Sequence, residues 1–168
     1  ELYPEEVFVF TPKGDLVRLP YGATPVDFAY AVHTDVGHRT IGARVNGQMV
    51  SLDHSLANGD TLEVVTSKTH VPSKDWLKFV RSSKAKQRIR AFLKAEEHAR
   101  SMALGMELLT KDLRKVKLSV KKLEKEGKLS AVATEMGLKS EGEMLAGIGY
   151  GKITTSKIIS KLLPENVA

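Results

Sequence analysis

The pattern of apolar residues changes at Val71-Pro72-Ser73, and this change limits the possible folds more than any other feature of the sequence. Before it, short β-prone runs are separated by turns, and after it apolar residues recur at helical spacing. Because proline interrupts both helices and strands, we place a domain boundary there. We expect one domain over residues 1–70 and a second over residues 71–168, which suits a chain of 168 residues.

Residues 1–70 predict a sheet built from hairpins. Thr11-Pro12-Lys13-Gly14 is typical of a turn, and Asn46-Gly47 is the strongest hairpin dipeptide because both central residues of that turn need a positive φ. The expected strands cover residues 7–10, 16–19, 40–45, 49–52 and 61–66.

One helix is expected within this part of the chain. Thr24 can cap it, Pro25 suits its first position, Asp27 lies near the positive end of its dipole, and Gly37 is a plausible end. A mixed sheet over one helix is the β-grasp arrangement of ubiquitin-like modules, and we expect that fold here. Val26, Ala29, Tyr30 and His33 fall on one face of this helix at helical spacing.

Residues 71–168 predict an all-α domain, so that the whole chain is expected to be α+β. Ser73 can cap a short helix around Trp76, and a long helix is expected from Ser83 to beyond Leu109. The predicted packing stripe of the long helix holds Ala85, Ile89, Phe92, Ala99, Ala103 and Met106. Later helices should begin at Ser119, Ser130, Ser140 (a capping box with Glu143) and Thr154 or Thr155, and end at Gly127, Gly137 and Pro164.

The net charge of +6 is unevenly distributed between the two halves. Residues 1–70 hold five basic and nine acidic residues, a net charge of −4, whereas residues 71–168 hold 21 basic and 11 acidic residues, a net charge of +10. This asymmetry favours different partners for the two domains. The basic half can bind a phosphate backbone, and the alternative is a lysine-rich solvated surface.

A dense basic cluster occupies the beginning of the long helix. Lys86, Arg90 and Lys94 form one ridge at a spacing of four residues. Lys84 and Arg88 form a second ridge. The helix is therefore expected to pack through its apolar stripe and to present cations that bind nucleic acid in a salt-dependent way, and the alternative is a face that only confers solubility.

His38 and Arg39 follow Gly37 in a segment that we expect to be an exposed loop. A histidine ring and a guanidinium can stack on an unpaired base and hold a phosphate, as in the recognition of single-stranded RNA. The alternative is a histidine that caps a helix end. His33, Asp35 and His38 match the spacing of no standard metal site, so we expect neither a metal nor another cofactor.

No set of residues predicts catalysis. Residues 147–152 (Gly-Ile-Gly-Tyr-Gly-Lys) are similar to a phosphate-binding loop, but they lack its Gly-Lys-Ser/Thr ending and follow a helix. A helix–glycine loop–helix contact with duplex DNA is a minor alternative for this stretch. Because no paired carboxylates, Ser-His-Asp set or cysteine can be assembled, we do not expect the chain itself to be an enzyme.

The sequence also predicts the compartment. No apolar run approaches the ~20 residues of a membrane span, and the absence of cysteine fits a reducing cytosol, so we expect a cytoplasmic protein without membrane contact. The acidic start, Glu1 to Glu6, is unlike a signal peptide, and the missing initiator methionine indicates a piece of a longer protein.

Four stretches carry a resemblance to a known family: VFVFTPKGD (7–15), TPVDFAY (24–30), HTDVGHR (33–39) and IGARVNG (41–47). With them, residues 5–68 resemble a TGS domain, a module named for threonyl-tRNA synthetases, certain GTPases and SpoT-type stringent-response proteins. The resemblance is strongest to the long RelA/SpoT homologues, and residues 73–163 are similar to the helical domain that follows TGS in that family, notably at Asp75-Trp76 and Ile148–Gly151.

The resemblance implies a regulatory role. Members of the family synthesise (p)ppGpp from ATP and either GTP or GDP, and they also hydrolyse it. The parent of this segment is therefore expected to be a GTP diphosphokinase or (p)ppGpp hydrolase. In ribosome-bound members, TGS contacts the 3′ CCA end of deacylated tRNA through a histidine that His38 matches, and the helical domain lies along the acceptor arm. Deacylated tRNA and the ribosome are therefore the expected partners.

SpoT-type members use the same domain to bind acyl carrier protein, so this acidic protein or another regulatory protein is the alternative partner. The RNA-binding residues that we expect are His38, Arg39, Lys13, Arg44, Lys84, Lys86, Arg88, Arg90 and Lys94.

Overall fold

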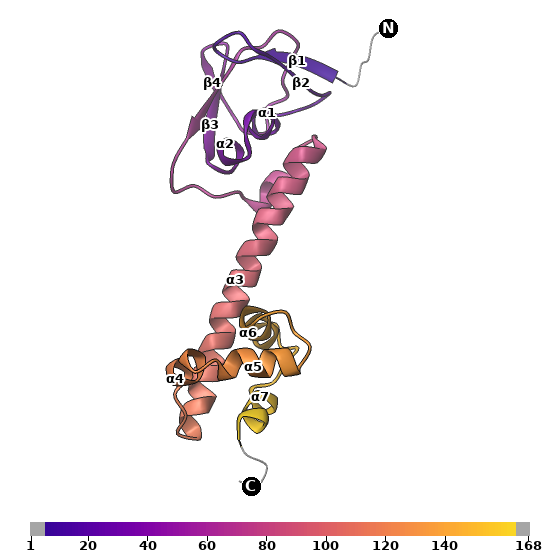
Figure 1. Ribbon diagram of the computed structural model, residues 1–168. Helices are drawn as coiled ribbons and strands as arrows, with labels where there is room; N and C mark the ends of the chain where they lie inside the picture. The colour runs from indigo at the N-terminus through magenta and orange to yellow at the C-terminus, as the bar shows by residue number, and fades with distance from the viewer. Residues whose placement is uncertain (1–5, 164–168) are drawn as a thin grey trace. The chain divides into compact units, whose positions relative to one another are not determined.

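The computed structural model describes residues 6–163, which divide into two compact units between residues 94 and 95 (Figure 1). The first unit contains the strands, three short helices and the first turns of a long helix, and the second is helical, so the expected α+β fold is confirmed. Residues 74–94 pack with the first unit, where Trp76 and Ile89 share a buried cluster with Val26 and Tyr30. The domain boundary expected after residue 70 stays a prediction.

The first unit has the expected β-grasp arrangement, with all five predicted strands. β1 pairs antiparallel with β2, and β3 lies between β4 and β5 in a second antiparallel group. A parallel bridge between Phe10 and Thr61 connects the two groups, which makes the sheet mixed. The strands are β1 (Glu6–Phe10), β2 (Leu16–Pro20), β3 (Thr40–Val45), β4 (Gln48–Val50) and β5 (Leu62–Thr66).

The predicted hairpin at Asn46-Gly47 is confirmed, because both residues have positive φ angles, 52° and 87°. Asn46 also connects this turn to the next one. Its side-chain amide donates to the Asp60 carboxylate at 3.1 Å, and its amide oxygen accepts from the backbone N–H of Thr61 at 2.9 Å. The two turns at this end of the sheet are therefore held together.

Helix α1 (Pro25–Val32) begins as predicted, with Thr24 as its cap and a reciprocal capping box between Thr24 and Asp27. It ends earlier than expected. His33 leaves the helix and caps a second short helix, α2 (Thr34–His38), by accepting from the backbone N–H of Asp35 at 3.0 Å. The placement of His33 on the face of α1 was therefore wrong, and Gly37 lies inside α2 rather than ending α1.

Apolar side chains from the sheet and from α1 form the core of the first unit. Strand residues of β1, β2, β3 and β5 pack with Phe28 of α1, and the other side of α1 packs on the segment that leads into α3. That segment includes the short 3₁₀ helix η1 (Lys74–Lys78), which Ser73 caps as predicted.

Helix α3 (Ser83–Lys115) confirms the predicted long helix. Its first turns bury Ala85 and Ile89 as expected, but Ala99 and Ala103 are exposed, so that part of the predicted stripe was wrong. The later turns instead bury Leu109 and Leu113 in the core of the second unit. One amphipathic stripe cannot describe this helix, because its two ends pack into different cores.

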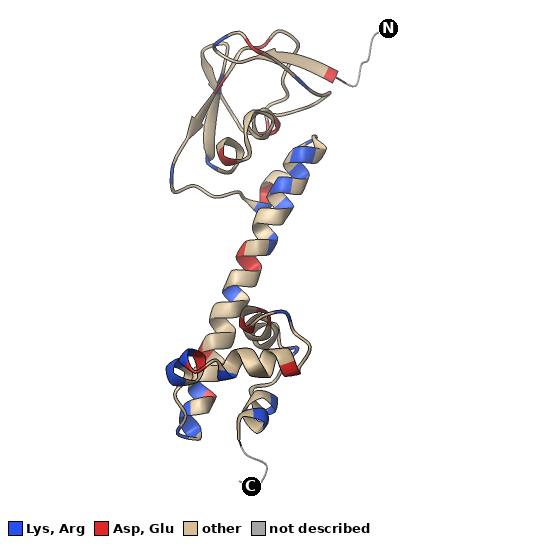
Figure 2. Cartoon of the chain, viewed as in Figure 1, with Lys and Arg blue, Asp and Glu red and all other residues tan. Residues whose placement is uncertain are grey.

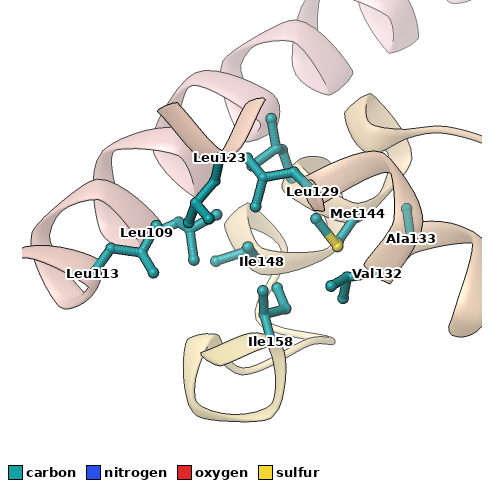
Figure 3. Close-up of a cluster of buried hydrophobic side chains, with 10 residues drawn as sticks. Leu109, Leu113, Leu123, Leu129, Val132, Ala133, Met144, Ile148 and Ile158 are labelled. Atoms are coloured by element: carbon teal, nitrogen blue, oxygen red, sulfur yellow. The ribbon is translucent and has the colours of Figure 1, made fainter. Parts of the chain in front are cut away.

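The second unit packs the end of α3 with four shorter helices around one apolar cluster, centred on Leu129, Met144 and Ile158 (Figure 3). These helices are α4 (Val120–Lys125), α5 (Lys128–Glu135), α6 (Glu141–Gly149) and α7 (Thr155–Leu162). Lys117, which lies between α3 and α4, has a positive φ of 62°.

The predicted starts of these helices are confirmed at Ser119, Ser140 and Thr154. The predicted start at Ser130 was wrong, because α5 begins at Lys128. The residue before it, Gly127, has a left-handed conformation. The Glu143 side chain accepts from the backbone N–H of Lys139 at 3.1 Å, one residue before the cap. Pro164, the expected end of the last helix, lies outside the described residues.

The glycines of residues 147–151 have packing roles in this unit. A Cβ on Gly149 would overlap the carbonyl group of Ser101, and a Cβ on Gly105 would overlap that of Leu145, so both glycines let α3 and α6 cross in close contact. Gly147 leaves room for the Ile153 side chain, and Gly151 has a positive φ of 80°. Helix packing therefore accounts for Gly149, room for a side chain accounts for Gly147, and the left-handed conformation of a turn accounts for Gly151.

Candidate functional site

His38 lies at the end of α2 and is half-buried, so the expectation of an exposed loop was wrong. Its Nδ1 atom is 2.9 Å from the hydroxyl oxygen of Tyr30, a fully buried residue of α1. Gly37 makes this contact possible, because a Cβ at that position would overlap the Tyr30 ring. The short helix therefore packs directly on α1 and holds the histidine against it.

Aromatic side chains from two helices lie against the His38 ring, and a third aromatic residue contacts its backbone. The ring centroid of Phe92, from α3, lies 4.9 Å away at an interplanar angle of 52°, and the Tyr30 ring lies edge-on at 5.4 Å. His70 stacks on Trp76 at 5.6 Å and 22°, and its Nδ1 atom lies 3.4 Å from the carbonyl oxygen of His38. Both the ring and the backbone of His38 are therefore held in place.

The protonation of this cluster follows from its burial. Desolvation lowers the pKa of His38 below its usual value, the Asp35 carboxylate opposes this, and the Arg88 guanidinium lowers it further. Burial raises the pKa of Tyr30, so its hydroxyl keeps its proton. His38 is therefore neutral near pH 7, and Arg88 lies close enough to influence it.

The first turns of α3 hold a dense group of Lys and Arg residues (Figure 2), and Phe92, which contacts the His38 ring, lies among them. Lys84, Arg88, Arg90 and Lys94 are exposed and Lys86 is half-buried, and none of the five forms an ion pair within residues 6–163. Arg39, the C-terminal cap of α2, is exposed as well. The structure thus brings His38 and Arg88, which are 50 positions apart in the sequence, into one surface.

Two of the expected RNA-binding residues, Arg44 and Lys13, lie on other parts of the TGS sheet than the end where His38 is found. Arg44 is on β3 and pairs with Glu63 of β5 at 3.3 Å. Lys13 is in the turn after Phe10, at the end of the sheet where Phe10 bridges to Thr61. His38 instead precedes Thr40, which pairs with Thr66 at the other end of β5.

Asp27 connects α1 to the start of α3, a role that the sequence did not predict. Its buried carboxylate accepts from the backbone N–H and the hydroxyl of Thr24 at 2.9 and 3.1 Å. It also accepts from the backbone N–H of Arg81 and of Ser82, at 3.0 and 2.8 Å, directly before α3. Asp27 therefore fixes the start of the basic helix to α1. The sequence indicated only its local capping role, and no local pattern links it to residues 54 positions away.

Within residues 6–163, no three His, Asp or Glu side chains are arranged to hold a metal ion, and no helix is long and apolar enough to cross a membrane. In the second unit, a cavity of about 460 Å³ lies between the end of α3 and the start of α4, and Arg114, Lys117 and Lys121 are among its lining residues.

Comparison with known families assigns both parts of the chain. The model of the TGS domain matches residues 7–66, and the model of the RelA/SpoT AH domain matches residues 92–163.

The chain is a TGS domain followed by a RelA/SpoT AH domain.

Full-length relatives share both domains with this chain. A GTP pyrophosphokinase from Myxococcus xanthus is 50% identical over 165 residues, which are 98% of this chain and 22% of the relative. One from Streptomyces coelicolor is 47% identical over 165 residues, covering 97% of this chain and 20% of the relative. The bifunctional (p)ppGpp synthase/hydrolase RelA of Mycobacterium tuberculosis is 42% identical over 167 residues, which are 98% of this chain and 23% of the relative.

The chain is therefore homologous to part of RelA/SpoT (p)ppGpp synthetases and hydrolases, and it spans about a fifth of their length. Within it, His38 belongs to the TGS domain, and Phe92 is the first residue matched to the AH domain. The cations from Lys84 to Arg90 lie between the two matches. The candidate site thus combines a TGS residue with the helix that leads into the AH domain.

Proposed function

We propose that this chain is the regulatory segment of a cytoplasmic stringent-response enzyme that makes or hydrolyses (p)ppGpp, and that it senses deacylated tRNA on the ribosome. In this proposal the TGS domain recognises the 3′ CCA end of the tRNA, and the basic turns of α3 and the AH domain follow the acceptor arm.

The observation that supports this proposal best is the contact between the His38 ring and Phe92, which lies on α3 one helical turn after Arg88. A half-buried, neutral imidazole suits contacts with an unpaired nucleotide, and exposed cations suit contacts with phosphates. Because the five cations of α3 have no acidic partner within residues 6–163, their charge is available to a ligand. An esterified aminoacyl group on the terminal ribose would crowd a site of this kind.

The free cations also favour a second candidate, an acidic protein such as acyl carrier protein. The two functions differ in the role of His38. An acidic protein surface would bind the cations, but it has no unpaired nucleotide for His38 to contact.

Binding titrations with the 168-residue chain separate the candidates. Deacylated tRNA, the same tRNA carrying its amino acid, and acyl carrier protein are each titrated at several salt concentrations. We expect tighter binding of deacylated than of aminoacylated tRNA, with affinity that falls as salt rises. Equal affinity for the two tRNA forms, or binding of acyl carrier protein alone, would contradict the proposal.

A further inference from the structure

The hydroxyl of Tyr30 has one partner within residues 6–163, the Nδ1 atom of His38 at 2.9 Å. Tyr30 is fully buried, and burial raises its pKa, so the hydroxyl carries its proton. That proton needs an acceptor, because a buried hydroxyl without one loses its hydrogen bonds to water without replacement.

Only one protonation state of His38 satisfies this requirement. If Nδ1 is unprotonated, the Tyr30 hydroxyl donates to it and both atoms are satisfied. If Nδ1 carries a proton, as in the imidazolium ion or the other neutral form, the hydroxyl must accept and its own proton is left without a partner. The Tyr30 contact therefore selects the neutral ring with its proton on Nε2.

The Nε2 atom itself is free to bind a ligand. It has no hydrogen-bond partner in the part of the chain that the structure describes. No buried side-chain nitrogen or oxygen lacks a partner in that part, so Nε2 must reach solvent. The rest of the ring lies against Tyr30 and Phe92.

We propose that Tyr30 is a positioning residue that fixes His38 as a neutral hydrogen-bond donor, and that Nε2–H of His38 donates to an acceptor atom of the terminal unpaired nucleotide of tRNA. The second part rests on the proposed function of the chain.

In this arrangement His38 contacts the terminal nucleotide through a directed hydrogen bond, and its ring does not stack on the base. Ribose oxygens and the ring nitrogens of adenine are acceptors that a neutral N–H can recognise. Because the ring carries no charge, attraction of the phosphates is left to cations such as Arg88 and Arg39. His38 then contributes discrimination between ligands, and the cations contribute affinity that does not depend on the terminal nucleotide.

The first experiment measures the tautomer of the free protein. The chain is labelled with ¹⁵N-histidine, and the two ring nitrogens of His38 are identified by NMR near pH 7. We expect an unprotonated Nδ1 and a protonated Nε2 in the parent. In Tyr30→Phe, which removes only the hydroxyl, we expect a mixture of the two tautomers. The control is Tyr21→Phe, because Tyr21 is 69% exposed and belongs to the same domain.

A protonated Nδ1 in the parent, or an unchanged tautomer in Tyr30→Phe, would overturn the role of Tyr30. Because the measurement on the parent needs no substitution, it stands even where Tyr30→Phe folds poorly.

The second experiment uses two amides at position 38. The side-chain NH₂ of His38→Gln can take the place of Nε2–H, whereas that of His38→Asn lies nearer the place of Nδ1. We expect His38→Gln to keep the preference for deacylated tRNA, and His38→Asn to lose about tenfold of it, the loss expected for one hydrogen bond.

Equal losses in the two amide variants would show that the aromatic ring, and not the donor, makes the contact. If the tautomer depends on Tyr30 but the parent shows no preference between the tRNA forms, the proposed function and the recognition step fail together, and the role of Tyr30 in fixing the ring remains.

Discussion

His38 takes its chemical character from residues that surround it in space. Tyr30 holds Nδ1, Phe92 lies against the ring, and the Arg88 guanidinium helps to lower its pKa. Gly37 leaves the room for the Tyr30 ring. A histidine in an open loop would titrate near pH 6.5 and would exchange between tautomers, whereas this one is held in a single form.

The lowered pKa of His38 predicts how binding depends on pH. The ring stays neutral as pH falls from 8 to its ordinary pKa of about 6.5, and it becomes protonated only at lower pH, as pH passes through the lowered folded pKa. The preference for deacylated tRNA should therefore be constant between pH 8 and about 6.5 and decrease below that range.

The groups that act on this titration are the Tyr30 hydroxyl, the Asp35 carboxylate and the Arg88 guanidinium. The free energy of unfolding changes with pH in the same direction as the binding preference. The unfolded chain binds the proton first, so the contribution of His38 is complete above about pH 6.5 and is lost as pH falls through the folded pKa. Titrations and thermal melts at a series of pH values check both effects. A preference that already declines between pH 8 and 7 would show that the ring is not held in its neutral form.

Asp27 should be the most costly carboxylate to remove from the TGS domain. Asp27→Ala removes the acceptor of four donors, two from Thr24 and one each from Arg81 and Ser82. We expect a loss of at least about 2 kcal/mol in the free energy of unfolding, since buried donors are left without partners and a helix cap is lost.

Denaturant unfolding measures the effect of Asp27→Ala. The matched control is Asp15→Ala, because Asp15 is an exposed turn residue whose side chain has no hydrogen-bond partner within residues 6–163. Similar unfolding midpoints for the two variants would mean that Asp27 does not hold the start of α3.

At the scale of elements, the basic ridge of α3 should carry much of the salt dependence. Reversing Lys86, Arg90 and Lys94 to glutamate should weaken tRNA binding and reduce the slope of log K against log salt, by close to one unit for each phosphate that the helix no longer neutralises. The measurement is the tRNA affinity at four or more salt concentrations.

The control for this variant reverses three lysines of α4: Lys121, Lys122 and Lys125. It changes the net charge by the same amount at a different site. An unchanged slope in the α3 variant would show that the ridge is a solvated face, and equal changes in both variants would show that α3 contributes no more to the salt dependence than α4 of the AH domain does.

The crossing of α3 and α6 in the AH domain depends on two glycines. Gly105→Ala and Gly149→Ala each place a methyl group on a backbone carbonyl of the other helix, which can yield only if the helices move apart. Each substitution should lower the free energy of unfolding of the AH domain by about 1–3 kcal/mol, the usual effect of overpacking.

Gly142→Ala is the matched control in the same helix. Its Cβ would come close to the flexible end of the Met102 side chain and would make an ordinary contact with the Ser140 hydroxyl, and alanine favours a helix by about 1 kcal/mol relative to glycine. We therefore expect Gly142→Ala to be neutral or stabilising in a thermal melt. If the three variants melt alike, the close crossing is not needed for stability.

At the scale of the whole molecule, local signals predicted most of the fold. Asn46-Gly47, the Thr24 cap with Pro25, and the caps at Ser73, Ser119 and Ser140 were all confirmed, because each depends on a few neighbouring residues. The errors arose where packing decides. Ala99 and Ala103 fit a helical stripe, but the helix leaves one core and enters another, and periodicity contains no information about this change.

The candidate site was predictable only in part, for the same reason. The sequence indicated His38 through its resemblance to a family and the cations of α3 through their density. It did not show that Tyr30 and Phe92 enclose the ring or that Asp27 fixes the start of α3, because these interactions join residues far apart in the chain. The roles of Lys13, Arg44 and the other expected RNA-binding residues stay predictions.

The central claim is that His38 distinguishes deacylated from aminoacylated tRNA while the cations of α3 provide general affinity. The most direct test is a titration of the parent chain and of His38→Ala with both forms of one tRNA at the same salt concentration. We expect His38→Ala to lose most of the preference for deacylated tRNA, about tenfold for the loss of one hydrogen bond, and to keep its affinity for the aminoacylated form. A variant that prefers deacylated tRNA as strongly as the parent would contradict the account and place the discrimination elsewhere.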